Sequence, residues 1–166
     1  VEPVIPEHLS AVLQKLRDCG CQLEIDQTGI SITPGDIQAV DITTQPFPGF
    51  PTDLQAPFMA LMATAQGTSV ISEKIYENRL QHVAELQRMG ASIRVDGSTA
   101  IVEGVAQLSA APVTGSDLRA AAAMVLAGLA ANGTTKVSGL KHLDRGYDNV
   151  EAKLNAVGAQ LERQHG

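Results

Sequence analysis

The stretches that decide the fold are TDLQAPFMALMATAQGT at residues 52–68 and SDLRAAAAMVLAGLAANGT at residues 116–134. Each opens with a hydroxyl residue and an aspartate, continues as an apolar helical pattern and closes on glycine and threonine. Thr52 or Ser116 in that place predicts an N-cap, and the aspartate suits the positive end of a helix. Both helices are apolar around nearly their whole circumference, which predicts two buried central helices with sheets packed outside.

A shorter pattern, in which a helix ends at a glycine and an alternating strand follows, occurs three times. Glycine favours the left-handed conformation that closes a helix, and alternation of apolar and polar residues predicts a half-buried strand. The three glycines and the strands expected after them are Gly20 with 21–25, Gly90 with 91–95, and Gly158 with 159–163.

These patterns divide the chain into repeats of an α/β fold within a single domain, residues 1–166. A partial first repeat, residues 1–50, holds a helix and two strands. The second, residues 51–105, reads helix, strand, helix, strand, strand, and the third, residues 106–164, reads helix, strand, helix, strand. Since the chain begins with Val1, we expect an excised piece or a processed product that lacks its structural partner.

Composition favours a globular protein and excludes some partners. The chain has 166 residues, of which 44% are hydrophobic, enough for one domain with a sizeable core. A net charge of −6 provides no general basic field for nucleic acid or for an anionic membrane. The sequence shows neither an apolar stretch of about 20 residues nor a secretory signal, so a cytoplasmic location is expected.

Neither the cysteines nor the histidines have the spacing of a metal site. Cys19 and Cys21 are separated by one residue, which fits neither a zinc knuckle nor a CxxC redox pair, and we expect two free thiols. The histidines are His8, His82, His142 and His165. No metal is predicted, and neither a phosphate-binding loop nor a dinucleotide fingerprint is present.

Two carboxylates and three arginines are the candidate site residues. Asp53 and Asp117 occupy equivalent places at the two helix starts, where a carboxylate serves as a general base or simply as a helix cap. Arg79 follows Gly67 by twelve positions, and Arg145 follows Gly133 by the same distance. Both arginines are expected in polar loops between a strand and a helix, and such loops bind anions. Arg119 faces the same cleft or pairs locally with Asp117.

Several segments, taken together and in this order, resemble the enolpyruvyl transferases, in the branch that acts on UDP-N-acetylglucosamine. They are FPTDLQA at 50–56, IYENRLQHVAELQRMGA at 75–91, DLRA at 117–120, VLAGL at 125–129 and LDRGY at 143–147. The resemblance covers essentially the whole chain. It implies βαβαββ units repeated around buried helices, a three-fold inside-out α/β barrel, which agrees with the repeats described above.

The resemblance also implies a reaction. The enolpyruvyl group of phosphoenolpyruvate moves to the 3-hydroxyl of UDP-N-acetylglucosamine with release of phosphate, without a cofactor, as the first committed step of peptidoglycan synthesis. By resemblance, Asp53, Asp117 and Arg145 have catalytic roles. The residues that contact the substrates are, by the same resemblance, Asp53, Ile75, Arg79, Arg119 and Arg145.

In this family a second domain supplies the rest of the site, so we expect residues 1–166 to be inactive without that complementary domain. Two alternatives remain open from the sequence. One is the related transferase that acts on shikimate 3-phosphate. The other is a non-catalytic binding module with the same fold.

Overall fold

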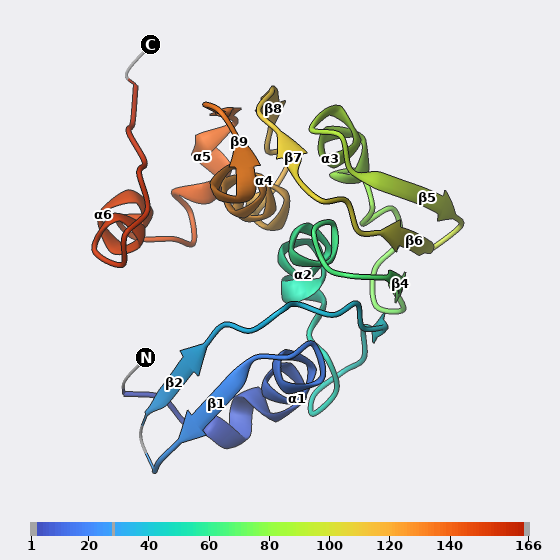
Figure 1. Ribbon diagram of the computed structural model, residues 1–166, viewed down its shortest axis with the longest axis vertical. Coiled ribbons are helices and arrows are strands. Elements are labelled where there is room, and N and C mark those ends of the chain that lie inside the picture. Colours follow the sequence, from blue (N-terminus) through green and yellow to red (C-terminus); the bar gives the residue numbers. More distant parts are fainter. Residues whose placement is uncertain (1–2, 28, 165–166) are drawn as a thin grey trace.

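The computed structural model describes residues 3–27 and 29–164, which form short helices and strands in an alternating order (Figure 1). In chain order the elements are η1 (Pro6–Leu9), α1 (Ser10–Asp18), β1 (Gln22–Ile25), β2 (Ile30–Thr33), β3 (Ile42–Thr43), η2 (Thr52–Leu54), α2 (Gln55–Met62), β4 (Thr68–Ser72), α3 (Val83–Arg88), β5 (Ser92–Asp96), β6 (Thr99–Glu103), β7 (Leu108–Ser109), β8 (Pro112–Thr114), α4 (Leu118–Ala130), β9 (Ala131–Asn132), β10 (Lys136–Ser138), α5 (Leu140–Leu143) and α6 (Val150–Asn155).

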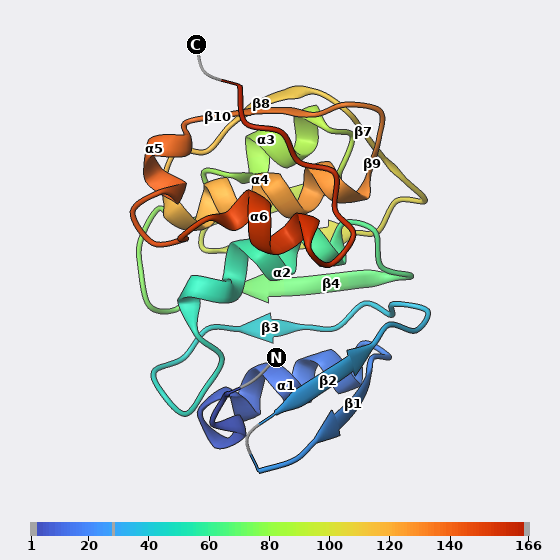
Figure 2. The ribbon, with the colours of Figure 1, turned by 90° about the vertical axis from the view of Figure 1, so that its left-hand side faces the viewer.

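Helices α2 and α4 pack against each other at the centre of the molecule, with the strands and the other helices around them (Figures 1 and 2). The two helices carry small and flexible apolar side chains, among which Met59, Met62 and Met124 are completely buried. The predicted pair of central helices is therefore confirmed. The burial of α4 is incomplete, because Leu126 and Leu129 remain 40% and 41% exposed.

A four-stranded sheet in the order β3-β4-β6-β5 covers one side of α2. β6 is antiparallel to both β4 and β5, whereas β3 runs parallel to β4. Alternate side chains of this sheet are buried, including Ile71, Ala100 and Val102, as the period-two pattern requires. The predicted order helix, strand, helix, strand, strand for residues 51–105 is confirmed by α2, β4, α3, β5 and β6.

The remaining strands form two-stranded pairs. β1 and β2 are antiparallel, as predicted for a helix followed by two strands in the first repeat. β7 pairs with β9 and β8 with β10, in both cases parallel. Sheets thus lie outside the central helices, as the predicted α/β fold requires, and the described part of the chain does not close into a barrel.

The strand predicted after Gly158 is wrong, whereas the helix end itself is correct. Gly158 has a positive φ of 99° and follows α6, but the residues after it pair with no strand among the described residues. The side chain of Asn155 takes the place of a neighbouring strand. Its Oδ1 accepts a hydrogen bond from the Leu161 N–H at 2.8 Å, and its Nδ2 donates to the Leu161 carbonyl at 2.9 Å.

Gly104 provides a test of the packing between the sheet and the central helix. A β-carbon on this residue would lie 1.6 Å from the carbonyl oxygen of Ala65, a backbone atom that cannot rotate away. We expect Gly104→Ala to lower the free energy of unfolding by about 3 kcal/mol, the upper end of the usual cost of overpacking, since the backbone has to move. Thermal or urea unfolding monitored by circular dichroism measures the loss.

The matched control is Gly90→Ala. Gly90 has a φ of 90°, but a β-carbon there would meet no atom within 4 Å. Only the cost of the left-handed conformation applies, about 1–2 kcal/mol. Equal losses in the two variants would contradict the close packing of Gly104 on Ala65.

Candidate functional site

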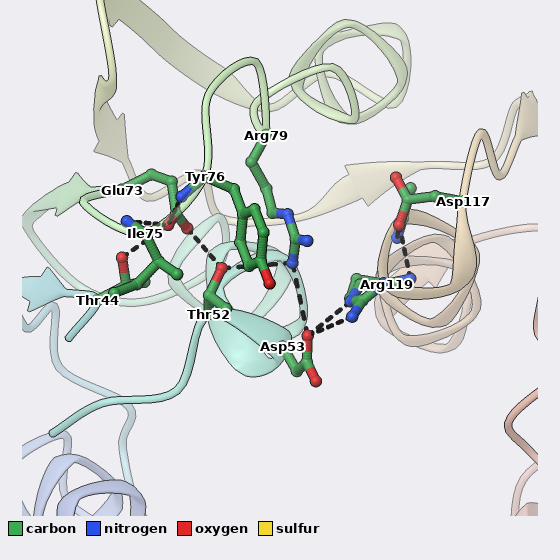
Figure 3. Close-up of polar contacts among 10 residues, drawn as sticks. Thr44, Thr52, Asp53, Glu73, Ile75, Tyr76, Arg79, Asp117 and Arg119 are labelled. Carbon is green, nitrogen blue, oxygen red and sulfur yellow. Dashed lines mark hydrogen bonds and ion pairs between the residues drawn. The ribbon is translucent and has the colours of Figure 1, made fainter. Parts of the chain in front are cut away.

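The first turns of the two central helices place a carboxylate and an arginine in direct contact (Figure 3). Asp53 lies in η2 and Arg119 in the first turn of α4. The Nε and Nη2 atoms of Arg119 are each 2.7 Å from Asp53 Oδ1. The hydrogen bond that Arg119 donates to the Asp53 carboxylate raises the pKa of Arg119 above its ordinary value. An interaction across 66 positions of sequence therefore joins the second and third predicted repeats.

Arg79 reaches the same carboxylate from the loop between β4 and α3. Its Nη1 lies 3.5 Å from Asp53 Oδ1 and 3.3 Å from the hydroxyl of Thr52, and its guanidinium carbon lies 4.3 Å from the centre of the Tyr76 ring. The aromatic face and the two oxygens fix the direction of the guanidinium. Among the described residues, all the bonds to the Asp53 side chain end on Oδ1, so Oδ2 is accessible to a ligand.

An open hollow of about 530 Å³ borders Arg79. The loop that holds Arg79 forms one wall, and the turn between β5 and β6 forms the other, with Val95, Gly97 and Ser98. Glu73 and Tyr76 also line it. Asp53 and Arg119 are not among the residues that line this hollow, so it adjoins the charged cluster only through Arg79.

Asp117 is itself the N-cap of α4, which corrects the prediction that Ser116 caps this helix. Asp117 Oδ1 accepts hydrogen bonds from the backbone N–H of Arg119 at 2.8 Å and of Ala120 at 3.2 Å. Thr52 is not a cap either, because the chain enters α2 through a 3-10 turn that carries no side-chain cap. Asp53 and Asp117 thus differ in function within the fold: the first binds arginines, and the second caps a helix.

Arg145 lies in an exposed turn after α5. The prediction that its loop joins a strand to a helix is wrong, because the loop joins α5 to α6. A β-carbon on the adjacent Gly146 would lie 3.0 Å from Leu118 Cδ2, so the turn packs against the start of α4. Bidentate bonds of 2.7 and 3.0 Å from Arg163 to Asp144 hold it there. The contacts of the described residues do not connect Arg145 with Asp53.

Ile75 lies in the loop that leads to Arg79, three positions after β4 ends. Its backbone N–H donates to Glu73 Oε1 at 2.8 Å. Sequence reasoning did not select Glu73, whose side chain is only 2% exposed, nor Thr44, which also binds it. A carboxylate two positions after the β-branched stretch 68–71 was the available signal.

The described residues include no group of His, Cys, Asp or Glu side chains that fits a metal ion. Both cysteines are free thiols, as expected, and Cys19 is buried. His165 lies outside the described residues. Within the described part of the chain, no helix combines the length and the apolar character needed to cross a membrane.

Comparison with known proteins gives the family. The family model of EPSP synthase (3-phosphoshikimate 1-carboxyvinyltransferase) matches residues 1–154, and the chain belongs to this family. Within it, the chain is 98% identical over 166 residues to the UDP-N-acetylglucosamine 1-carboxyvinyltransferase of Parasynechococcus marenigrum (strain WH8102), and 82% identical over 163 residues to that of Synechococcus sp. (strain CC9605). It spans 38% of the length of each.

Solved structures agree with this family. The enolpyruvyl transferase NikO from Streptomyces tendae matches 92% of this chain and 36% of its own, with a TM-score of 0.83 and 28% identity. The EPSP synthase from Acinetobacter baumannii matches 93% of this chain and 37% of its own, with a TM-score of 0.71 and 20% identity, a likeness that concerns the fold alone. The inside-out α/β architecture expected from the sequence is the fold of these neighbours.

His82, one turn after Arg79, is buried beside the site. Its side chain is 3% exposed, and its Nε2 has no hydrogen-bond partner among the described residues. Burial lowers the pKa of His82 to about 4, although the charge of Asp117 and a hydrogen bond with the backbone of Arg79 oppose the change. The imidazole is therefore neutral in the folded protein at neutral pH.

This burial predicts an acid-sensitive fold. Between pH 6.5 and about 4 the unfolded chain binds a proton at His82 that the folded chain does not, so the free energy of unfolding falls as the pH falls. The full loss, reached below pH 4, is about 3 kcal/mol. We expect His82→Leu to remove this part of the pH dependence, as measured by urea unfolding from pH 7 to pH 4. His8→Gln, at an exposed histidine, is the control, and an unchanged acid slope in His82→Leu would contradict the prediction.

Proposed function

We propose that these 166 residues form part of an enzyme that transfers the enolpyruvyl group of phosphoenolpyruvate to the 3-hydroxyl of UDP-N-acetylglucosamine. The observation that carries the proposal is the 98% identity, over the whole chain, to a relative named UDP-N-acetylglucosamine 1-carboxyvinyltransferase. The alternative substrate, shikimate 3-phosphate, is supported by the name of the family model. The EPSP synthase structures, however, are only 20% and 21% identical to this chain.

Asp53 is the residue we assign as general base. Its Oδ2 takes the proton of the sugar 3-hydroxyl, the hydroxyl oxygen bonds to C2 of phosphoenolpyruvate, and C3 gains a proton from solvent, to which it is later returned. Phosphate then leaves C2 as C3 loses a proton, which restores the double bond. The ion pairs of Oδ1 with Arg79 and Arg119 keep this carboxylate oriented, and a fixed base contributes about 10²–10⁴-fold to such a step.

The arginines provide charge for the anionic substrate. Arg79 and Arg145 are proposed to hold the phosphate and carboxylate of phosphoenolpyruvate, because forked guanidinium groups match both anions. Arg119 and Asp117 are proposed to lie at the same cleft. Asp117 supports the first turn of α4 by accepting from the backbone N–H groups of Arg119 and Ala120. Ile75 is proposed to contact the UDP-sugar. No cofactor is required by this chemistry.

The rest of the site is proposed to come from the part of the relatives that this chain does not span. A site assembled from half of its charged groups binds weakly, so we propose that the 166 residues alone release no phosphate. The reaction would serve peptidoglycan synthesis, and with it cell-wall formation, cell shape and division, in the cytoplasm.

The experiment uses a full-length enzyme in which these 166 residues replace the matching segment of the Parasynechococcus marenigrum relative. We expect phosphate release that requires both phosphoenolpyruvate and UDP-N-acetylglucosamine. Asp53→Asn is expected to lower kcat about 10²–10⁴-fold because the amide cannot accept the proton. Asp96→Asn, at an exposed carboxylate at the end of β5, is the matched control.

Three results would contradict the proposal. Turnover with shikimate 3-phosphate in place of the UDP-sugar would favour the related transferase. Binding of UDP-N-acetylglucosamine without any turnover would favour a non-catalytic module. Full activity of Asp53→Asn would exclude Asp53 as the base while leaving the reaction itself intact.

A further inference from the structure

Glu73 is a carboxylate buried without a cation. Its side chain is 2% exposed, and the described residues include no ion pair to it. Instead, four donors surround it. Oε1 accepts from Thr44 Oγ1 at 2.9 Å, from the N–H of Ile75 at 2.8 Å and from the N–H of Tyr76 at 3.1 Å, while Oε2 accepts from Thr52 Oγ1 at 2.9 Å. Three of these bonds end on Oε1 and one on Oε2, and in all four the carboxylate is the acceptor.

The direction of both hydroxyl bonds is determined by the surroundings. Thr44 Oγ1 accepts from the backbone N–H of Lys74 at 2.8 Å, so its own proton points to Glu73. Thr52 Oγ1 accepts from Arg79 Nη1 at 3.3 Å, and a guanidinium can only donate, so the Thr52 proton also points to Glu73. The Thr52 hydroxyl therefore connects the buried carboxylate to the guanidinium of Arg79.

The four donors belong to three separate chain segments, namely the residue directly after β3, η2 and the loop after β4 (Figure 3). Two of these segments hold the residues proposed to meet substrate. Thr52 precedes Asp53 and contacts Arg79, and Ile75 follows Glu73 by two positions. Removing the Glu73 charge from water costs free energy, and a hydrophobic residue at this position would avoid that cost. Glu73 borders the hollow but is only 2% exposed, and its carboxylate oxygens bind protein donors, so we assign it no direct contact with substrate.

We propose that Glu73 is a positioning residue that sets the geometry of Asp53 and Arg79 through Thr52, and that of the Ile75 backbone directly. This inference rests on the function proposed above. One carboxylate oxygen holds the sugar-contacting loop, and the other holds the turn with the general base. A single side chain thereby fixes the Ile75 loop and the turn of Asp53 relative to each other.

The substitution Glu73→Gln distinguishes the two sets of bonds: the arm to Thr52, through Oε2, and the arm to the Ile75 loop, through Oε1. Three donors converge on Oε1, so the amide oxygen is expected to occupy that place and to preserve the bonds to Thr44, Ile75 and Tyr76. The amide NH2 then faces Thr52 Oγ1, which already accepts from Arg79 and loses the acceptor for its own proton. Only the arm to Thr52 is disrupted.

The test uses the full-length enzyme containing this segment. We expect Glu73→Gln to lower kcat about 10- to 100-fold, because the base and Arg79 are displaced. The KM for UDP-N-acetylglucosamine should change by less than about threefold, since the arm to Ile75 persists. Thr52→Val should reproduce the loss, Thr52→Ser should recover most of it, and the double variant Glu73→Gln/Thr52→Val should lose no more than the larger single effect. Glu103→Gln, at an exposed carboxylate of β6, is the matched control.

A second measurement does not depend on turnover. The NMR relaxation of the Arg79 side-chain Nε–H should report greater motion in Glu73→Gln and in Thr52→Val than in the unsubstituted enzyme and Glu103→Gln. If the unsubstituted enzyme proves inactive, the proposed function fails, and this measurement still tests the positioning of Arg79. An unchanged kcat in folded Glu73→Gln accompanied by a lower Tm, or unchanged Arg79 motion, would overturn the inference and leave Glu73 a purely structural residue.

Discussion

The packing of α2 along α4 is the interaction on which the rest of the structure depends. Each helix is too apolar to lie on a surface, and burying them against each other removes their side chains from water. Because α2 and α4 begin at the same end of this pair, the packing also places Asp53 beside Arg119. The force that stabilises the core thus determines the distance between the charged groups of the candidate site.

A second level of organisation lies in the buried polar groups around that helix pair. Glu73 joins three segments by accepting hydrogen bonds alone. The Thr52 hydroxyl donates to Glu73 and accepts from Arg79, so it connects the two side chains. The Asp53 carboxylate, in turn, uses one oxygen for arginines and presents the other. A site whose exposed charges are held by buried neighbours needs little rearrangement when a ligand arrives, which is the condition for effective electrostatic stabilisation.

The prediction from sequence was most successful where local chemistry is strong. The apolar circumference of residues 117–131 predicted a buried helix, and Gly20, Gly90 and Gly158 each follow a helix with a positive φ, as expected. The strand predicted at 159–163 failed because a strand exists only when a neighbour pairs with it, and Asn155 satisfies the backbone there. Strands such as β3 and β7, two residues long, have too little alternation to be detected.

For the site, the sequence by itself determined which groups are available: aspartates at two helix starts and arginines at a fixed distance after two glycines. It could not determine which of them meet. Only the tertiary structure decided that Asp53 binds Arg79 and Arg119 whereas Asp117 caps α4, and that Glu73 is buried among donors from distant segments. The physical reason is that spacing along a chain fixes local geometry, whereas contacts between repeats depend on how the central helices pack.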